Sequence, residues 1–490
     1  MGNNSLQPRN KKLTTQYIQF IIAAAILVFV SKFPLPESVL TAGNVILNDK
    51  GRMSLGILFF CLYLWITEPI PFHITGCIGI LLMAFCKLDS FGNIIKLGFG
   101  SDTIIFFIGV LTLSAFITLS GLGKRISMFI LSVTGNKTSS VLMGFMIAGT
   151  LISMWITDMA VAAMLMPIAR SMLEDEGLKP KESNFGKALM ITCAWGALIG
   201  GIGTPAGCGP NQIAIGFMKS MLGINISFLQ WMTYGVPAAL IMIVPSWWLL
   251  LKMFKPEITH LSKTKEDLKR EFKQMGPMTK NEISTTVVFV ITVTLWLTST
   301  PLEKIIGFDM STTIPALICA CLFFLPGATT FKWKEISDDI SWDGIILIAT
   351  GISLGMVMYS TGAAEWLSVI LLGGIVSLHP VIQIFLIVMI VSIIKVGLSS
   401  NTVTATIIMP IMVVLAQSNN MPLMGILLPT ALSLSLAFIL VTSTPTSVIP
   451  YSAGYFSIPD MAKAGAIMTV IASVVVALTV FGLGLVTGLY

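Results

Sequence analysis

The stretch TDMAVAAMLMP at residues 157–167 has a counterpart, SNTVTATIIMP, at residues 400–410, 243 positions further along the chain. Each begins with polar side chains in the middle of a long apolar segment, near 139–169 and 379–415. These segments are too long for a single span, which takes about 20 residues. A segment that enters the membrane, turns on a polar tip and leaves on the same side is a re-entrant hairpin. Such non-helical backbone is tolerated only where protein or a water-filled cavity covers it.

Other landmarks repeat at nearly the same offset, which indicates an internal duplication. Asp102 matches Asp343, 241 residues further on. After each hairpin, glycine, threonine and proline interrupt an apolar segment, as GGIGTPAGCGPN at 200–211 and VTSTPTSVIP at 441–450. Five spans and one hairpin per copy make an odd number of crossings, so we expect the second copy to be inverted. Inverted repeats with paired broken helices predict a transport site near the middle of the membrane.

The composition places the whole chain in a membrane. Of its 490 residues, 55% are hydrophobic and 11% are charged, whereas soluble domains carry roughly 25% charged residues. Lipid leaves no partner for open backbone groups and no alternating barrel pattern is present, so we predict an all-α polytopic membrane protein. About 11 transmembrane helices are expected beside the two re-entrant hairpins, near 17–32, 53–68, 72–88, 103–123, 187–218, 231–253, 284–300, 311–326, 343–361, 423–450 and 463–488.

The basic residues indicate the orientation. The loop 255–283 holds seven Lys/Arg, whereas 362–378 and 416–422 hold none. Cytoplasmic loops are enriched in Lys and Arg. We therefore predict a multi-pass protein of the plasma (inner) membrane with a cytoplasmic N-terminus and the C-terminus outside. The net charge of +6 then reflects topology, and no nucleic-acid partner is expected.

This topology divides the chain into four parts. The first repeat contains scaffold spans, the hairpin 139–169 and the broken helix 187–218. The second contains scaffold spans, the hairpin 379–415, the broken helix 423–450 and the last span. The predicted parts are 1–52 (tail and first span), 53–254 (first repeat), 255–283 (amphipathic interfacial linker) and 284–490 (second repeat).

The sequence contains none of the patterns expected of a metal site or a membrane enzyme. Its seven cysteines form no CxxC pair, and its three histidines are dispersed. HExxH and GxSxG motifs are absent. We expect no cofactor, metal ion or catalytic residue. A channel would need a continuous polar lining along several spans, which the sequence does not show.

The hairpin tips and the breaks present helix N-termini, where unsatisfied N–H groups and the helix dipole favour an anion. Hydroxyl and amide groups can hold carboxylate oxygens there without a fixed positive charge, and unwound carbonyls can coordinate Na⁺. Elsewhere in the spans such residues mostly serve helix packing. The side chains that we expect to contact an anionic ligand include Thr157, Asn211, Ser400, Asn401, Thr402, Thr444 and Thr446.

These motifs, together with WITEPIPFHITG at 65–76, resemble the divalent anion/sodium symporter family, which includes bacterial dicarboxylate carriers and citrate and 2-oxoglutarate/malate exchangers. The resemblance covers nearly the whole chain. It implies a homodimer in which a transport domain moves against a scaffold domain as an elevator. It also implies that dicarboxylates bind between the tips. The residues it places at the substrate are Thr157, Asp158, Ser400, Asn401, Thr402, Thr444 and Pro445, and it places Na⁺ near the backbone of Ser153, Gly203 and Ser443.

The chain departs from that family pattern at both tips. Thr157-Asp158-Met159 replaces Ser-Asn-Thr, and Lys395-Val396 stands where a cation-binding hydroxyl is expected. An ionised Asp158 would repel a dianion, so we expect it to be protonated, cation-bound or ion-paired. Lys395 is the candidate partner, and its fixed ammonium would remove the need for sodium. Alternatively, Lys395 snorkels or pairs with a scaffold acid.

We therefore expect a secondary carrier of C4/C5 dicarboxylates such as succinate, malate, fumarate or 2-oxoglutarate, with exchange favoured. The alternative is a sodium-coupled di- or tricarboxylate symporter, with Na⁺ as the coupling ion. A third hypothesis is an inorganic oxyanion or cation/proton carrier, which predicts charged ligands at both tips. Only Asp158 fits that pattern. The expected partners are the small dicarboxylate, the lipid bilayer and a second copy of the chain.

Overall fold

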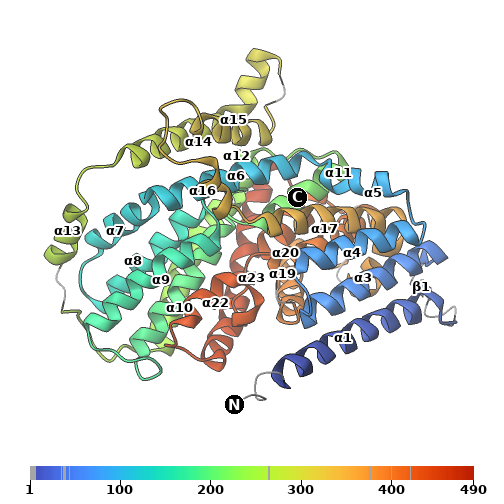
Figure 1. Cartoon of the computed structure of the whole chain (residues 1–490), viewed down its shortest axis with the longest axis horizontal. Coiled ribbons are helices and arrows are strands. Elements are labelled where there is room, and N and C mark those ends of the chain that lie inside the picture. The colour runs from blue at the N-terminus through green and yellow to red at the C-terminus, as the bar shows by residue number, and fades with distance from the viewer. Residues whose placement is uncertain are drawn as a thin grey trace.

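The structure, a computed structural model, describes residues 7–34, 36, 40–42, 45–262, 265–308, 310–372, 374, 377–398, 400–419 and 421–490. This part of the chain is almost entirely helical (Figure 1). Its strands are β1 (Thr41–Ala42) and β2 (Val45–Ile46), which form a short antiparallel ribbon.

The described helices, in chain order, are α1 (Gln7–Lys32), α3 (Asp49–Thr67), α4 (Phe72–Phe85), α5 (Phe91–Phe99), α6 (Asp102–Ser120), α7 (Leu122–Thr134), α8 (Thr138–Ser153), α9 (Asp158–Asp175), α10 (Asn184–Gly201), α11 (Gly209–Leu222), α12 (Phe228–Met253), α13 (Lys265–Gln274), α14 (Lys280–Ile306), α15 (Thr313–Phe323), α16 (Trp333–Asp339), α17 (Trp342–Ser360), α18 (Ala363–Leu372), α19 (Pro380–Val396), α20 (Asn401–Ser418), α21 (Leu423–Ser433), α22 (Pro445–Ser452) and α23 (Ile458–Thr487). Seven of these are long and apolar enough to cross a membrane: α1, α6, α12, α14, α17, α20 and α23. Shorter apolar helices lie among them. The prediction of a polytopic all-α membrane protein is confirmed.

Both segments predicted as hairpins are helix–turn–helix units. In the first, α8 ends at Ser153 and α9 begins at Asp158, after a turn that contains Thr157. In the second, α19 ends at Val396 and α20 begins at Asn401. The start and the end of α9 each differ from those of α20 by 243 residues. Ser399, one of the polar residues at the second tip, lies outside the described residues.

Both predicted breaks are also present. The apolar segment 187–218 is divided into α10 and α11 by irregular backbone, and 423–450 is divided into α21 and α22. In each case the second helix starts after an extended residue, Cys208 or Thr444, and has proline in its first turn. Proline is well tolerated at that position, because the first N–H groups of a helix have no intrahelical partner.

The structure contains more helices than the hydropathy of the sequence predicts. The helices α5 and α16 are too short to span a bilayer, and α7 and α18 follow directly on longer spans. They nevertheless occur in pairs: the bounds of α5 and α16, α6 and α17, and α8 and α19 differ by 240 to 243 residues. The two series of helices therefore share one order over these elements.

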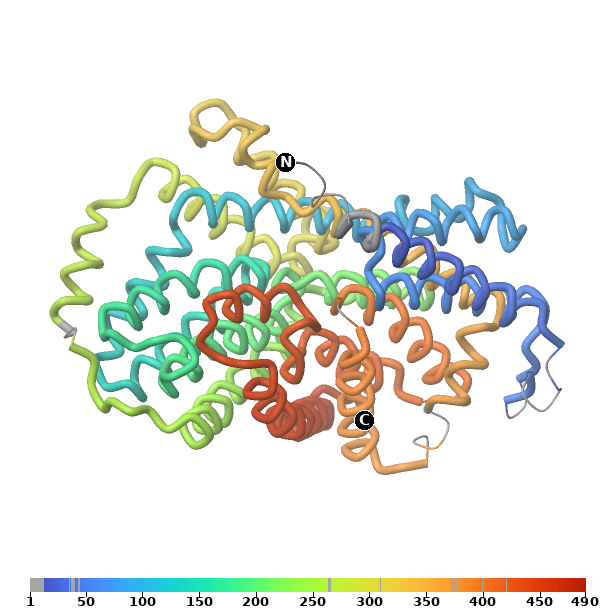
Figure 2. The backbone as a smooth tube through the Cα atoms, turned by 60° about the horizontal axis from the view of Figure 1, so that its bottom comes forward, coloured from blue at the N-terminus to red at the C-terminus, as the bar shows by residue number. Residues whose placement is uncertain are grey.

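The hairpin helix α8 and the broken helix α10 pack closely along their length (Figures 1 and 2). Glycines allow this contact, because a Cβ on Gly200 would overlap the carbonyl oxygen of Thr150. Hydroxyl groups of α8 also donate across the contact, from Thr150 to the Gly196 carbonyl at 3.3 Å and from Ser153 to the Ala197 carbonyl at 2.7 Å. The first tip and the first break are thus fixed to each other.

The linker between the two series contains α13, at the left edge of Figure 1, which packs against α7. The Arg125 guanidinium at the start of α7 contacts both Glu282 oxygens, with Nε to Oε1 at 2.7 Å, and donates to the Gly276 carbonyl at 2.8 Å. Both charged side chains are largely buried. These contacts hold the linker against the body of the protein.

Candidate functional site

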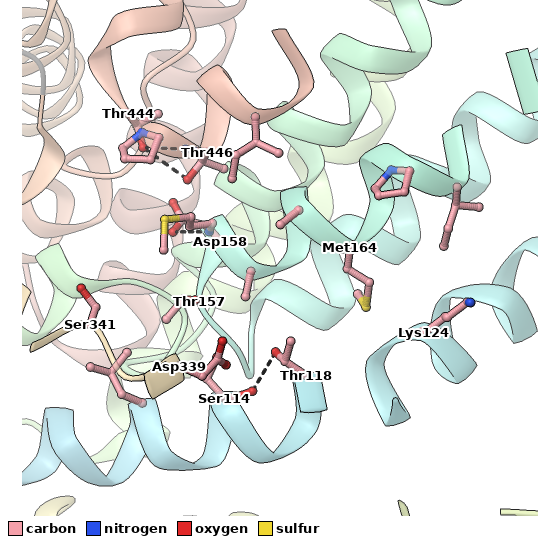
Figure 3. Close-up of a pocket in the computed structure, with 18 of the residues that line it drawn as sticks. Ser114, Thr118, Lys124, Thr157, Asp158, Met164, Asp339, Ser341, Thr444 and Thr446 are labelled. Carbon is pink, nitrogen blue, oxygen red and sulfur yellow. Dashed lines mark hydrogen bonds between the residues drawn. The ribbon is translucent and has the colours of Figure 1, made fainter. Parts of the chain in front are cut away.

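A cavity of about 1040 Å³ lies where the N-termini of α9, α20 and α22 meet. It brings together most of the substrate-binding residues predicted from the sequence. These lining residues are Thr157, Asp158, Ser400, Asn401, Thr402, Thr444 and Pro445. The wall also includes Thr446, which lies beside Asp158 (Figure 3).

Backbone contacts fix the first tip. The N–H of Asp158 donates to the Gly207 carbonyl at 3.2 Å, which ties the start of α9 to the first break. The Asp158 carboxylate accepts the N–H of Met159 at 2.9 Å and also meets the Thr446 hydroxyl. A carboxylate is stabilised at this end of a helix by the free N–H groups and by the dipole. It is half-buried on the cavity wall.

The second tip is fixed through side chains. Ser400 is the N-cap of α20, and its hydroxyl accepts the Val403 N–H at 3.4 Å. Asn401 is 7% exposed, and its Nδ2 donates to the Ser435 carbonyl at 3.5 Å. Its Oδ1 has no hydrogen-bond partner within the described part of the chain. Thr402 faces the cavity close to Gly209 of the opposite break.

The second break completes this wall. Thr444 is the N-cap of α22, and its hydroxyl accepts the Thr446 N–H at 3.4 Å and donates to the Thr446 hydroxyl at 3.3 Å. Both threonines are buried, whereas Pro445 between them is exposed to the cavity. Hydroxyl oxygens and a helix N-terminus therefore point at the same space as the two tips.

Lys395 is 2% exposed and lies at the end of α19. Its Nζ donates to the carbonyls of Ser433 and Leu434, at 3.0 and 3.1 Å, where α21 ends. Lys395 and Asp158 do not form a direct ion pair, since none of the ion pairs between described residues includes either side chain, but their opposite charges still attract each other over a longer distance. The described residues also show no ion pair between Lys395 and an acidic side chain of the scaffold. The helix C-terminus carries partial negative charge and supplies the compensation instead.

The other predicted residues lie behind the cavity wall. Asn211 donates from Nδ2 to the carbonyls of Gly201 and Thr204, each at 2.8 Å. The Ser153 hydroxyl donates to the Ala197 carbonyl of α10. A Cβ on Gly203 would come within 2.7 Å of the Met154 side chain. Ser443 is 3% exposed and donates to the Lys395 carbonyl at 3.3 Å. The cavity lining does not include these residues, which brace the breaks that shape it.

Some residues around the cavity were not predicted from the sequence. Cys208 Sγ lies 2.6 Å from Ser435 Oγ, which joins the first break to the second. Asp339, at the end of α16, faces the cavity opposite Asp158, and burial raises its pKa above the ordinary value. Lys124 lies on the wall formed by α7 (Figure 3). The repeat did not mark Asp339 either, because the residue of α5 that corresponds to it is Phe99.

Residues 14–487 match the family described as the sodium:sulfate symporter transmembrane region. The chain belongs to this family. The resemblance to divalent anion/sodium symporters is thereby confirmed.

Two of the proteins that this chain is similar to are named sodium-dependent dicarboxylate transporters. One is the sodium-dependent dicarboxylate transporter SdcS of Staphylococcus saprophyticus, 29% identical over 453 residues, which cover 89% of this chain and 86% of that protein. The SdcS of Staphylococcus aureus strain USA300 is 28% identical over 450 residues, which cover 88% and 86%. Among solved structures, MtrF of Neisseria gonorrhoeae, of a class of antimetabolite efflux pumps, is similar in fold alone. Its TM-score is 0.53 at 13% identity, over 95% of this chain and 94% of MtrF.

Proposed function

We propose that this protein carries C4/C5 dicarboxylates of the succinate, malate, fumarate or 2-oxoglutarate type across the plasma membrane. The observation that supports it is the meeting of α9, α20 and α22 at one cavity, where the two tips and the second break contribute five hydroxyl side chains to the wall: Thr157, Ser400, Thr402, Thr444 and Thr446. Helix N-termini and hydroxyl donors suit carboxylate oxygens. The two SdcS relatives are dicarboxylate transporters.

An elevator mechanism with inverted repeats is part of this proposal. Matching helix bounds support the duplication, and the odd number of crossings per copy supports the inversion. The transport domain would contain both hairpins and both broken helices, and the remaining spans of 53–254 and 284–490 would form a scaffold. A second copy of the chain would pack against that scaffold, with the N-terminus in the cytoplasm and the C-terminus outside.

Exchange is the favoured mode, and Lys395 supports it. A buried ammonium on the carbonyls of Ser433 and Leu434 supplies a positive charge where unwound carbonyls can hold Na⁺ in transporters. Unlike a bound ion, this side chain cannot leave the site. The empty site would therefore cross the membrane with its charge unbalanced, which costs several kcal/mol. A bound dicarboxylate would offset it, and only the loaded carrier would cross readily.

Sodium-coupled symport is the second candidate. Both SdcS relatives are sodium-dependent, and nothing among the described residues replaces a cation at the first break in the way that Lys395 does at the second. In this case Na⁺ would accompany the dicarboxylate as a transported ion and would balance the substrate charge together with Lys395.

Counterflow in proteoliposomes distinguishes the two modes. Labelled succinate uptake is measured into vesicles that are preloaded with succinate or left empty, in sodium or in choline buffer. The exchange proposal predicts uptake only into preloaded vesicles, equally in both buffers. Uptake into empty vesicles that requires sodium would establish symport. The absence of succinate counterflow in every condition would contradict dicarboxylate transport.

A further inference from the structure

Two acceptor groups on the cavity wall, one from each tip, lack a strong donor. The Asp158 carboxylate meets only neutral donors among the described residues, the N–H groups of Asp158 and Met159 and the Thr446 hydroxyl. Asn401 is more than nine-tenths buried. Its Nδ2 donates to the Ser435 carbonyl, whereas its Oδ1 has no partner in that part of the chain. An unsatisfied buried acceptor is costly. The site therefore calls for a ligand that donates as well as accepts hydrogen bonds.

The two acceptors lie on either side of one contact. Asp158 is hydrogen-bonded through its N–H to Gly207, and the next residue, Cys208, has its Sγ 2.6 Å from Ser435 Oγ. The Ser435 carbonyl in turn accepts from Asn401. Both Asp158 and Asn401 line the same cavity. One chain of contacts therefore joins the two tips that carry these acceptors.

The charges around the cavity favour a positive group at this position. Lys395 directs two of its N–H donors to main-chain carbonyls. The other charged lining residues are Lys124 on α7, Glu271 on α13 and Asp339 at the end of α16. A plain dicarboxylate would add two negative charges, of which Lys395 offsets one, so an excess negative charge would remain beside Asp158, which is unfavourable at membrane depth. An ammonium on the same carbon skeleton halves that added charge and brings three N–H donors.

We infer that the preferred substrate class is an α-amino dicarboxylate. Its ammonium binds the Asp158 carboxylate and the Asn401 Oδ1, and its two carboxylates bind the hydroxyls of both tips and of the second break. This inference rests on the proposed function and narrows its substrate class.

Succinate, malate and L-aspartate test it, because they differ only at C2, where they carry hydrogen, hydroxyl and ammonium. Counterflow into preloaded proteoliposomes gives a half-saturation concentration for each. We expect the half-saturation concentration to be lowest for aspartate, intermediate for malate and highest for succinate. The value for aspartate should be about tenfold or more below that for succinate, as a charge-assisted hydrogen bond allows.

Asp158→Asn should remove this preference: the half-saturation concentration for aspartate should rise about tenfold, and that for succinate should fall because the repelling charge is gone. Asp175→Asn is the matched control, since it removes a carboxylate from the other end of the same helix, away from the cavity. That variant should keep the wild-type ratio within about twofold. Thermal stabilisation of purified wild-type protein by each ligand provides a measurement that does not depend on a variant, and aspartate should stabilise most.

Succinate exchange without aspartate exchange or stabilisation would overturn this inference and leave dicarboxylate transport standing. If neither compound exchanges, both proposals fail. Comparing sodium with choline buffer shows whether these acceptors bind the ammonium of the substrate or a free Na⁺. Two results together would overturn the inference: wild-type protein shows no preference for aspartate, and Asp158→Asn loses the stimulation of succinate uptake by sodium. They would mean that the acceptors bind Na⁺ and not a substrate ammonium.

Discussion

At the scale of single residues, the two tips offer different chemistry although they occupy equivalent places. The first presents a hydroxyl, a carboxylate and a thioether at Thr157, Asp158 and Met159, and the second presents two hydroxyls and an amide at Ser400, Asn401 and Thr402. All six line the cavity. We therefore expect the second tip to hold most of the carboxylate oxygens, because it has more neutral donors.

Asn401→Ala and Thr402→Ala test the role of the second tip. Each removes a polar group that faces the ligand, and a hydrogen bond to a charged partner contributes about 1.5–3 kcal/mol. We expect dicarboxylate counterflow to fall about tenfold or more in each variant, with an unchanged elution volume in size-exclusion chromatography. Ser418→Ala, at the other end of α20, is the control. Transport within twofold of wild type in both test variants would place the binding site elsewhere.

Lys395→Ala tests the exchange mechanism. Removing the ammonium leaves the carbonyls of Ser433 and Leu434 without their donor and the bound dianion without its counter-charge. We expect exchange to fall at least tenfold, consistent with a loss of about 1.5–3 kcal/mol, while Lys395→Arg retains part of it because its charge is kept. The measurement is succinate uptake into preloaded and empty vesicles. Full exchange by the alanine variant would show that Lys395 is structural only.

The sequence predicts the members of this site better than their contacts. Hydroxyl and amide residues at a polar tip within an apolar segment point to Thr157, Ser400, Asn401 and Thr444, because such a cluster is costly at membrane depth unless it lines a cavity. The partner of Lys395 could not be predicted in the same way. Its partners are main-chain carbonyls, and every residue carries one, so no side chain in the sequence marks them.

At the scale of elements, the hairpin and the broken helix of the first copy behave as one unit. Glycines on α10 let its backbone approach α8, and hydroxyls of Thr150 and Ser153 bond across the contact. The periodicity of the sequence predicts two apolar segments here, and it does not predict that they touch. The contact depends on missing side chains at Gly196 and Gly200, and the sequence does not say which helix a glycine in an apolar run will face.

Gly200→Ala should separate these two helices. The added Cβ would overlap the Thr150 carbonyl oxygen, which is main chain and cannot rotate away. Overpacking of this kind costs about 1–3 kcal/mol, so we expect a lower midpoint of thermal unfolding in detergent together with reduced transport. Gly92→Ala on α5 is the matched control, since no atom lies within 4 Å of its added Cβ. Equal midpoints for the two variants would contradict the close packing of α8 on α10.

At the scale of the whole molecule, two series of helices in the same order surround one cavity. The pairs α9 with α20, α6 with α17, and α5 with α16 recur at offsets of 240 to 243 residues. A duplication followed by divergence would explain why the sequence shows only a few matching residues while the helix bounds recur at a nearly constant offset. The relative direction of the two series in the membrane is a proposal based on the odd number of crossings and on the basic loop 255–283.

Single cysteines in a cysteine-free background test that orientation. Residues 266–274 on α13 should react with an impermeant maleimide only from the cytoplasmic side, and residues 365–371 on α18 only from the outside. The basic linker and the uncharged segment lie on opposite sides if both hairpins re-enter. Comparing intact cells with inverted vesicles gives the answer. Labelling of both sets from one side would mean that one hairpin crosses the membrane, and the inverted repeat would be wrong.

The close contact between α8 and α10 has a kinetic consequence. Two elements joined by main-chain contact and by buried hydroxyl bonds are stiff, because packed protein interiors deform little. In the proposed elevator, a stiff pair would present the same first tip and first break in every position that it reaches. The ligand would then meet this half of the site in one geometry from either face, and any asymmetry between uptake and release would have to come from the other walls of the cavity or from the ligand concentrations.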